Sequence, residues 1–89
     1  MKLDAKFYGE IRKVKDDSVV PDEEYMVFLA KDNAFAAVLP VYLAICRSMH
    51  ADFEHIGAVE RTIERLNKWR EANPDRLKIP DAKGEKLLA

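Results

Sequence analysis

The sequence predicts a mainly α protein, a small helical bundle built on an antiparallel pair of helices at about 33–49 and 52–73. Within 52–73 the large aliphatic residues recur every three or four positions and draw one apolar stripe along a helix of roughly 33 Å; they are Ile56, Val59, Ile63 and Leu66. Apolar residues within 33–49 also follow helical spacing, and only a short turn separates the two ranges. A turn of that length brings the second helix back antiparallel to the first.

The first segment, residues 1–17, spaces its apolar side chains by four, four and three positions, as one face of a helix does; they are Leu3, Phe7, Ile11 and Val14. Gly9 would cost this helix about 1 kcal/mol relative to alanine. Residues 7–14 also fit a short strand, but we expect the helix.

Residues 16–21 break the helical pattern. Pro21 keeps Val20 out of the helical conformation, and it suits the first position of a new helix. A second helix could therefore begin at Pro21. The mostly apolar residues 25–31 fit a buried strand as well as they fit a helix. The alternative fold is accordingly α+β, with a β-hairpin from 7–14 and 25–31.

The helix at 33–49 is expected to begin after Asp32, whose carboxylate suits an N-cap. Its expected inner face, packed against the helix at 52–73, consists of Val38, Leu39, Tyr42 and Cys46. Pro40 has no N–H group and its ring collides with the carbonyl of Ala36. We therefore expect a kink near Leu39, or two shorter helices that meet there.

The helix at 52–73 is expected to be capped by the Asp52 side chain and to end at Asn73, because Pro74 cannot continue it. Residues 1–76 are predicted to form a single helical domain. Residues 77–89 are predicted to be a C-terminal tail, partly disordered, with Leu77 and Ile79 in contact with the domain.

Composition limits the classes of function. Hydrophobic residues make up 48% of the 89 residues and charged residues 35%, which is typical of a soluble globular domain. Fifteen basic and sixteen acidic residues give a net charge of -1, so no overall field attracts nucleic acid or an anionic membrane. The apolar run at 34–46 is shorter than the roughly 18 to 20 residues of a membrane span. With one cysteine and no leader-like start, we expect a cytoplasmic protein that does not enter the membrane.

No motif for catalysis, a metal or a cofactor stands out, and we expect a protein that is not an enzyme. His50, Asp52 and His55 are close in sequence, but two histidines five positions apart fall on different sides of a helix, unlike zinc ligands four apart. Cys46 has apolar neighbours, and a buried thiol in such surroundings is expected to be inert.

Two binding functions remain as alternatives. Arg61, Arg65 and Lys68 form a basic stripe on the helix at 52–73 that fits a nucleic-acid backbone, although acidic residues lie among them. A nucleotide or other small ligand could instead bind at a subunit interface and stack on an aromatic side chain; the candidates are Tyr25, Tyr42 and Trp69.

Two stretches, VVPDEEYMVFLAKDNAF and ADFEHIGAVERTIERLNKWREANPDRLKIPD, resemble small uncharacterised proteins from phage and prophage regions of bacterial genomes. The likeness extends from Lys6 to Asp81. It implies an accessory protein of a bacterial cell, and it carries over no activity and no functional residue.

The principal functional hypothesis is a non-enzymatic protein that acts through protein–protein interaction and self-association. Every residue from Ala34 to Cys46 is apolar, so this helix needs cover on all sides. A second subunit is the simplest cover, and a two-fold dimer is the commonest arrangement. Val41 and Ile45 are the expected contact residues, and a further protein partner is expected.

Overall fold

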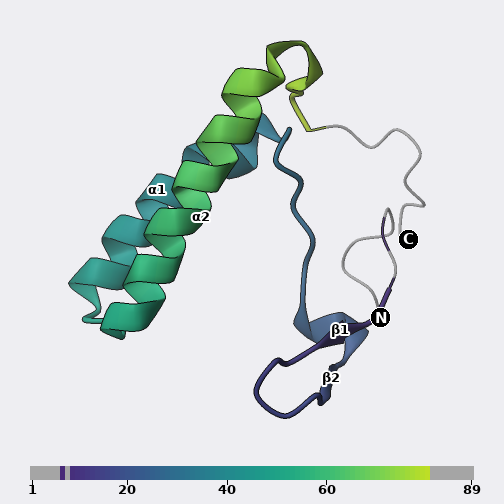
Figure 1. The fold of residues 1–89 in the computed structure, drawn as a ribbon, viewed down its shortest axis with the longest axis vertical. Coiled ribbons are helices and arrows are strands. Elements are labelled where there is room, and N and C mark those ends of the chain that lie inside the picture. Colours follow the sequence, from purple (N-terminus) through teal and green to yellow (C-terminus); the bar gives the residue numbers. More distant parts are fainter. Residues whose placement is uncertain (1–6, 8, 81–89) are drawn as a thin grey trace. The chain divides into compact units, whose positions relative to one another are not determined.

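The computed structural model describes residue 7 and residues 9–80, and its architecture is mainly α with one small hairpin (Figure 1). The elements in chain order are β1 (Ile11–Arg12), β2 (Val19–Val20), η1 (Asp22–Glu24), α1 (Asn33–Ser48), α2 (Phe53–Ala72) and η2 (Pro74–Arg76). The predicted fold class is thus confirmed. The described chain divides into two compact units, one ending at Val27 and one from Phe28 to Pro80. The predicted boundaries of 1–76 and 77–89 stay a prediction, since residues 1–6, 8 and 81–89 lie outside the described ranges.

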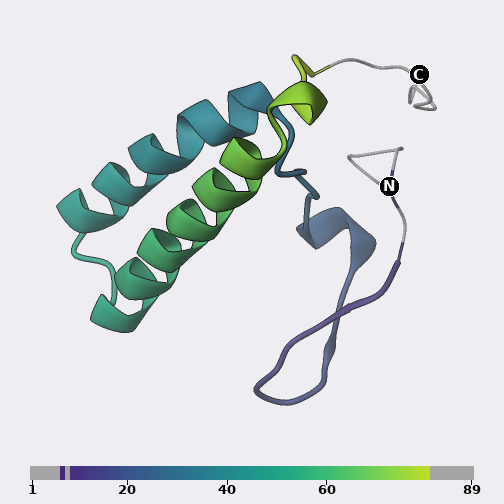
Figure 2. The same cartoon turned by 45° about the horizontal axis from the view of Figure 1, so that its top comes forward.

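The unit from Phe28 to Pro80 is built on α1 and α2, which lie side by side and antiparallel in both views (Figures 1 and 2). The turn between them ends α1 with His50 in the left-handed conformation, at φ 56°. The N–H of Ala51 donates to the carbonyl of Cys46 at 2.9 Å, and the N–H of His50 donates to Arg47 at 3.1 Å. These two bonds form a Schellman motif, which satisfies the last carbonyls of α1 and reverses the chain within a few residues.

The two helices begin at the predicted caps, but only one cap makes its side-chain bond. The carboxylate of Asp32 accepts a hydrogen bond from the N–H of Phe35 at 3.0 Å, as predicted. Asp52 occupies the N-cap of α2 without a side-chain bond, so the position is right and the predicted bond is wrong. The end of α2 is confirmed, with Asn73 as C-cap and Pro74 as the first residue of η2.

Pro40 lies inside α1, which runs unbroken from Asn33 to Ser48. The expectation that two shorter helices meet at this proline is therefore wrong. The Pro40 side chain is exposed, while Leu39 is buried and Leu43 half-buried against α2. Packing on both sides of the proline holds the two halves in one helix.

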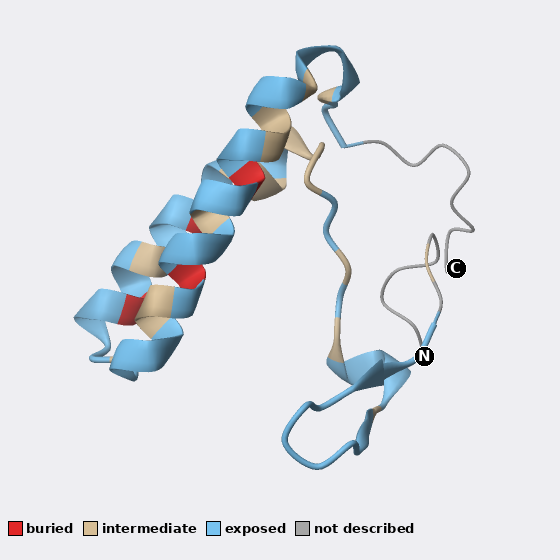
Figure 3. Ribbon diagram, viewed as in Figure 1, coloured by how far each residue is buried: buried red, intermediate tan, exposed pale blue. Residues whose placement is uncertain are grey.

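The core lies along the seam between the helices (Figure 3). Its buried side chains are Leu39, Cys46, Val59 and Leu66. The predicted stripe of α2 is confirmed, because Ile56 and Ile63 are half-buried beside Val59 and Leu66.

The predicted inner face of α1 is only half right. Leu39 and Cys46 are buried, whereas Val38 is 58% exposed and Tyr42 44% exposed. Leu43 takes the inner position instead. Because the sequence is apolar on every side of this helix, its pattern does not distinguish the stripe that contacts α2 from the stripes beside it.

The N-terminal segment is a hairpin, so the helix predicted at 1–17 is wrong within the described residues. Ile11 pairs with Val20, and Arg12 pairs with Val19. The turn is closed by Asp16, whose carboxylate accepts hydrogen bonds from the Ser18 N–H at 3.0 Å and the Ser18 hydroxyl at 2.6 Å. These bonds lower the pKa of Asp16. Acidic side chains commonly stabilise turns in this way, which accounts for the strand pairing found in place of a helix.

The segment after β2 also differs from both predictions made for it. The helix expected from Pro21 is one 3₁₀ turn, Asp22–Glu24, which ends at Tyr25. Residues 25–29 form neither helix nor strand, so the alternative hairpin of 7–14 with 25–31 is wrong. The Tyr25 hydroxyl lies 3.2 Å from the Gly9 carbonyl oxygen and 3.2 Å from a carboxylate oxygen of Asp22. These contacts tie the Tyr25 hydroxyl to Gly9 and Asp22 without strand pairing.

The residues after η2 return to the start of α1. The N–H of Lys78 donates to the carbonyl of Lys31 at 2.9 Å, and the N–H of Asn33 donates to the carbonyl of Lys78 at 2.9 Å. Leu77 is half-buried and Ile79 is exposed. Backbone bonds, more than the predicted side-chain contacts, therefore hold this stretch to the helix pair.

Candidate protein-binding face

One side of α1 remains uncovered by the rest of its compact unit. We call it the outer face and define it by five exposed side chains: Val38, Val41, Tyr42, Ile45 and Met49. The predicted contact residues both belong to it, with Val41 56% exposed and Ile45 49% exposed. Their spacings of three and four positions set these residues along one stripe of the helix.

The outer face carries no charge. Arg47 is the only charged residue in α1, and its guanidinium lies 3.2 Å from the carboxylate of Glu60 on α2. The Tyr42 hydroxyl lies 3.1 Å from Nε2 of His55, so it is also directed toward α2. Hydrogen bonding with Cys46, Coulombic repulsion from the thiolate form of Cys46 and desolvation raise the pKa of the Tyr42 phenol. The face offers a partner apolar surface and one neutral hydroxyl.

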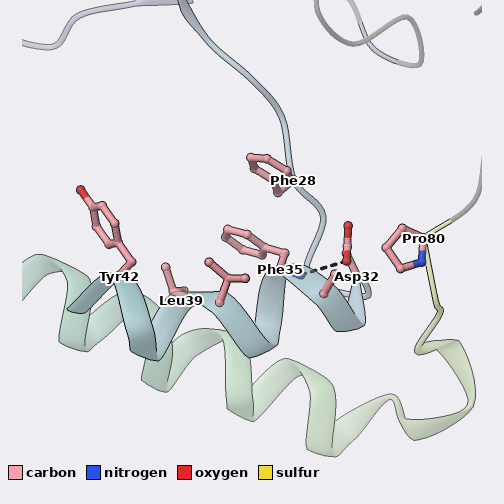
Figure 4. Close-up of a pocket in the computed structure, with 8 residues that line it drawn as sticks. Phe28, Asp32, Phe35, Leu39, Tyr42 and Pro80 are labelled. Carbon is pink, nitrogen blue, oxygen red and sulfur yellow. Dashed lines mark hydrogen bonds between the residues drawn. The ribbon is translucent and has the colours of Figure 1, made fainter. Parts of the chain in front are cut away.

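An open groove of about 560 Å³ runs along the flank of the outer face (Figure 4). It is lined by Phe28, Asp32, Ala34, Phe35, Val38, Leu39, Tyr42 and Pro80. Phe28 and Phe35 stack with ring centres 5.1 Å apart and planes 2° apart. Phe35 points away from the α2 ribbon in the close-up. Asp32 is the only charged lining residue, so the groove suits an apolar group and has no cation for a phosphate.

The residues proposed for chemistry do not gather into a site. Cys46 is a buried free thiol in the seam between the helices. His55 is engaged with Tyr42, and His50 lies in the turn after α1. Within residue 7 and residues 9–80, no three His, Cys, Asp or Glu side chains are grouped so as to hold a metal ion.

The basic stripe predicted for nucleic acid lies on the exposed side of α2. Arg61, Arg65 and Lys68 are all exposed. The Lys68 ammonium pairs with Glu64 one turn earlier, at 3.3 Å. Such an exposed pair is worth a few tenths of a kcal/mol, so Lys68 is only weakly held and the stripe remains accessible.

The three aromatic residues considered for a small ligand lie in different surroundings. Tyr42 lines the groove, and Tyr25 belongs to the compact unit that ends at Val27. Trp69 is half-buried near the end of α2, with the guanidinium carbon of Arg76 5.2 Å from its ring centre.

Sequence reasoning missed the stacked pair of Phe28 and Phe35, and it assigned Val38 to the inner face. Val38, Val41 and Ile45 are spaced by three and then four positions, which places all three on one stripe of the helix. Arg70 was also missed, since no local pattern indicates its contacts with residues before and within α1.

Among the described residues, neither α-helix is both long and apolar enough to cross a lipid bilayer. Comparison with known proteins identifies no relative, since the chain matches no family model, no curated protein and no solved structure.

Proposed function

We propose that the chain is a non-enzymatic interaction protein that works through the outer face of α1, by self-association and by binding a further protein. The supporting observation is the exposed, uncharged apolar stripe of that face. Large contiguous apolar patches on soluble proteins mark contact sites, because leaving them in water is unfavourable. Following the resemblance in sequence, the proposed setting is the cytoplasm of a bacterial cell, where the protein acts as an accessory factor of phage or prophage origin.

The inner side of the helix pair adds to this proposal. Only four described hydrophobic side chains are buried, and they form a single seam between α1 and α2. A helical hairpin with so small a core gains substantially from a partner that covers its other apolar side. Association would therefore contribute to the stability of the fold as well as to its function.

The direct test is the substitution Val41→Glu, with Ala44→Glu as the matched control. Both residues are exposed on α1, but only Val41 belongs to the outer face. We expect the unchanged protein to have twice the chain mass of 10.2 kDa by light scattering at micromolar concentration. Val41→Glu should convert it to a monomer, since burying an unpaired carboxylate is costly. Ala44→Glu should leave the dimer intact.

The proposal of self-association would be rejected by a specific pair of results. These are a monomer mass for the unchanged protein over the whole concentration range, and a Val41→Glu variant with unaltered solubility and stability. Circular dichroism of each variant establishes that the helices are still formed.

A further inference from the structure

The exposed and buried sides of α1 follow the same repeat. The inner seam, which contacts α2, consists of Ala36, Leu39, Leu43 and Cys46, spaced by three, four and three positions. The outer seam consists of Ala34, Val38, Val41 and Ile45, spaced by four, three and four positions. Alternation of three and four is the repeat of helices that pack along one another. Since residues advance by about 100° each, the two seams lie on nearly opposite sides of α1.

We propose that the outer seam is occupied by α1 of a second copy of this chain, antiparallel to the first, so that the two helical hairpins form a four-helix assembly with the two α1 helices side by side at its centre. This inference rests on the proposed function and names the partner of the outer face. Val38 of each copy faces Val41 of the other.

The absence of charged residues from the outer seam favours a second copy of this chain over a different protein as its partner. No charged residue occurs from Asn33 to Cys46, and all four residues of the outer seam are exposed and aliphatic. Two-fold pairing places the same surface of both copies face to face. Like charges in the seam would repel each other in this arrangement, and the uncharged outer seam avoids that repulsion. Partners of different sequence are commonly selected through complementary charges, and this seam offers none.

The size of the core supports the same occupant. The four buried side chains form one layered seam between α1 and α2, and none of the described side chains is less than 2% exposed. Two copies joined through their outer seams would add a second apolar seam, between the two α1 helices, to the seam that each α1 forms with its own α2.

The direction and register follow from helix electrostatics and from the residues available. Antiparallel neighbours set the positive end of one helix dipole beside the negative end of the other. With Val38 opposite Val41 of the second copy, Ala34 falls opposite Ile45, and every layer is aliphatic. A shift by one heptad would bring the polar Ser48 into the contact in place of Ala34. The first register therefore buries the most apolar surface.

Charge reversal across the interface tests this arrangement. Val38→Glu and Val41→Lys, made separately, each leave an uncompensated charge in the contact and should weaken the dimer at least about tenfold. The double variant Val38→Glu/Val41→Lys should recover the dimer, because each new glutamate faces a lysine of the other copy. Sedimentation equilibrium measures the dissociation constant in each case, with circular dichroism as the check on folding.

The outcomes separate this inference from the proposed function. A double variant that stays monomeric, while the unchanged protein is a dimer, overturns the antiparallel pairing and leaves self-association standing. Recovery of the dimer on mixing Val38→Glu with Val38→Lys also overturns it, because that result requires parallel helices. An unchanged protein that is monomeric throughout rejects self-association itself.

Discussion

Arg70 joins parts of the chain that are far apart in sequence. Its Nη1 donates to the carbonyl of Ala30 at 3.0 Å, and its Nη2 donates to Oδ1 of Asn33 at 2.7 Å. The side chain is half-buried near the end of α2, so these bonds are partly shielded from water. One planar guanidinium thereby anchors both the segment before α1 and the first residue of α1.

Replacing Arg70 with methionine keeps the apolar stem and removes both donors. We expect a loss of about 1.5 to 3 kcal/mol in the free energy of unfolding, the range for hydrogen bonds that involve a charged group. Urea denaturation followed by circular dichroism measures it. Arg65→Met, on the exposed side of the same helix, is the control and should change stability by less than about 0.5 kcal/mol. Equal effects of the two substitutions would contradict the anchoring role of Arg70.

At the scale of single residues, the sequence pointed to Val41 and Ile45 but not to Arg70. An apolar residue turned away from a stripe is evident from spacing alone, and both residues are exposed as expected. A hydrogen bond between residues 40 positions apart leaves no local trace in the sequence. Only the folded chain reveals it, because it depends on the antiparallel return of α2.

The N-caps of the two helices, Asp32 and Asp52, can be compared directly. Asp32 caps α1 with a hydrogen bond to Phe35, whereas Asp52 begins α2 without one. Asp32→Ala should therefore cost about 0.5 to 2 kcal/mol, the usual value of a side-chain N-cap. Asp52→Ala should cost clearly less, limited to the loss of a favourable charge at the helix start. Thermal unfolding of the two variants measures the difference in stability. A larger loss for Asp52→Ala than for Asp32→Ala would contradict this prediction.

The elements differ in how well their sequences predict them, and length explains the difference. In α2 the apolar stripe repeats over 20 residues, so the helix and its buried side follow from spacing. In the hairpin each strand has two residues, too few to display alternation. The hydrogen bonds between Asp16 and Ser18 favour a turn in that region. They prevail over the helical spacing of Ile11 and Val14.

The whole molecule should become more stable as its concentration rises. If two copies associate through their outer faces, dimer formation draws the unfolding equilibrium toward the folded state by mass action. The midpoint of thermal unfolding is then expected to increase from micromolar to millimolar protein, while that of Val41→Glu stays constant. Differential scanning calorimetry provides the measurement. A midpoint of the unchanged protein that is independent of concentration would mean that each chain is stable alone.

The backbone bonds of Lys78 to both sides of Asp32 have a consequence for the architecture of larger proteins. They bring the entry and the exit of the Phe28–Pro80 unit to one end of the helix pair. A unit whose two ends are neighbours can be spliced into a surface loop of a host protein without stretching the host backbone. The helix pair is thus suited to insertion into an unrelated host protein, which would then display the apolar stripe of α1.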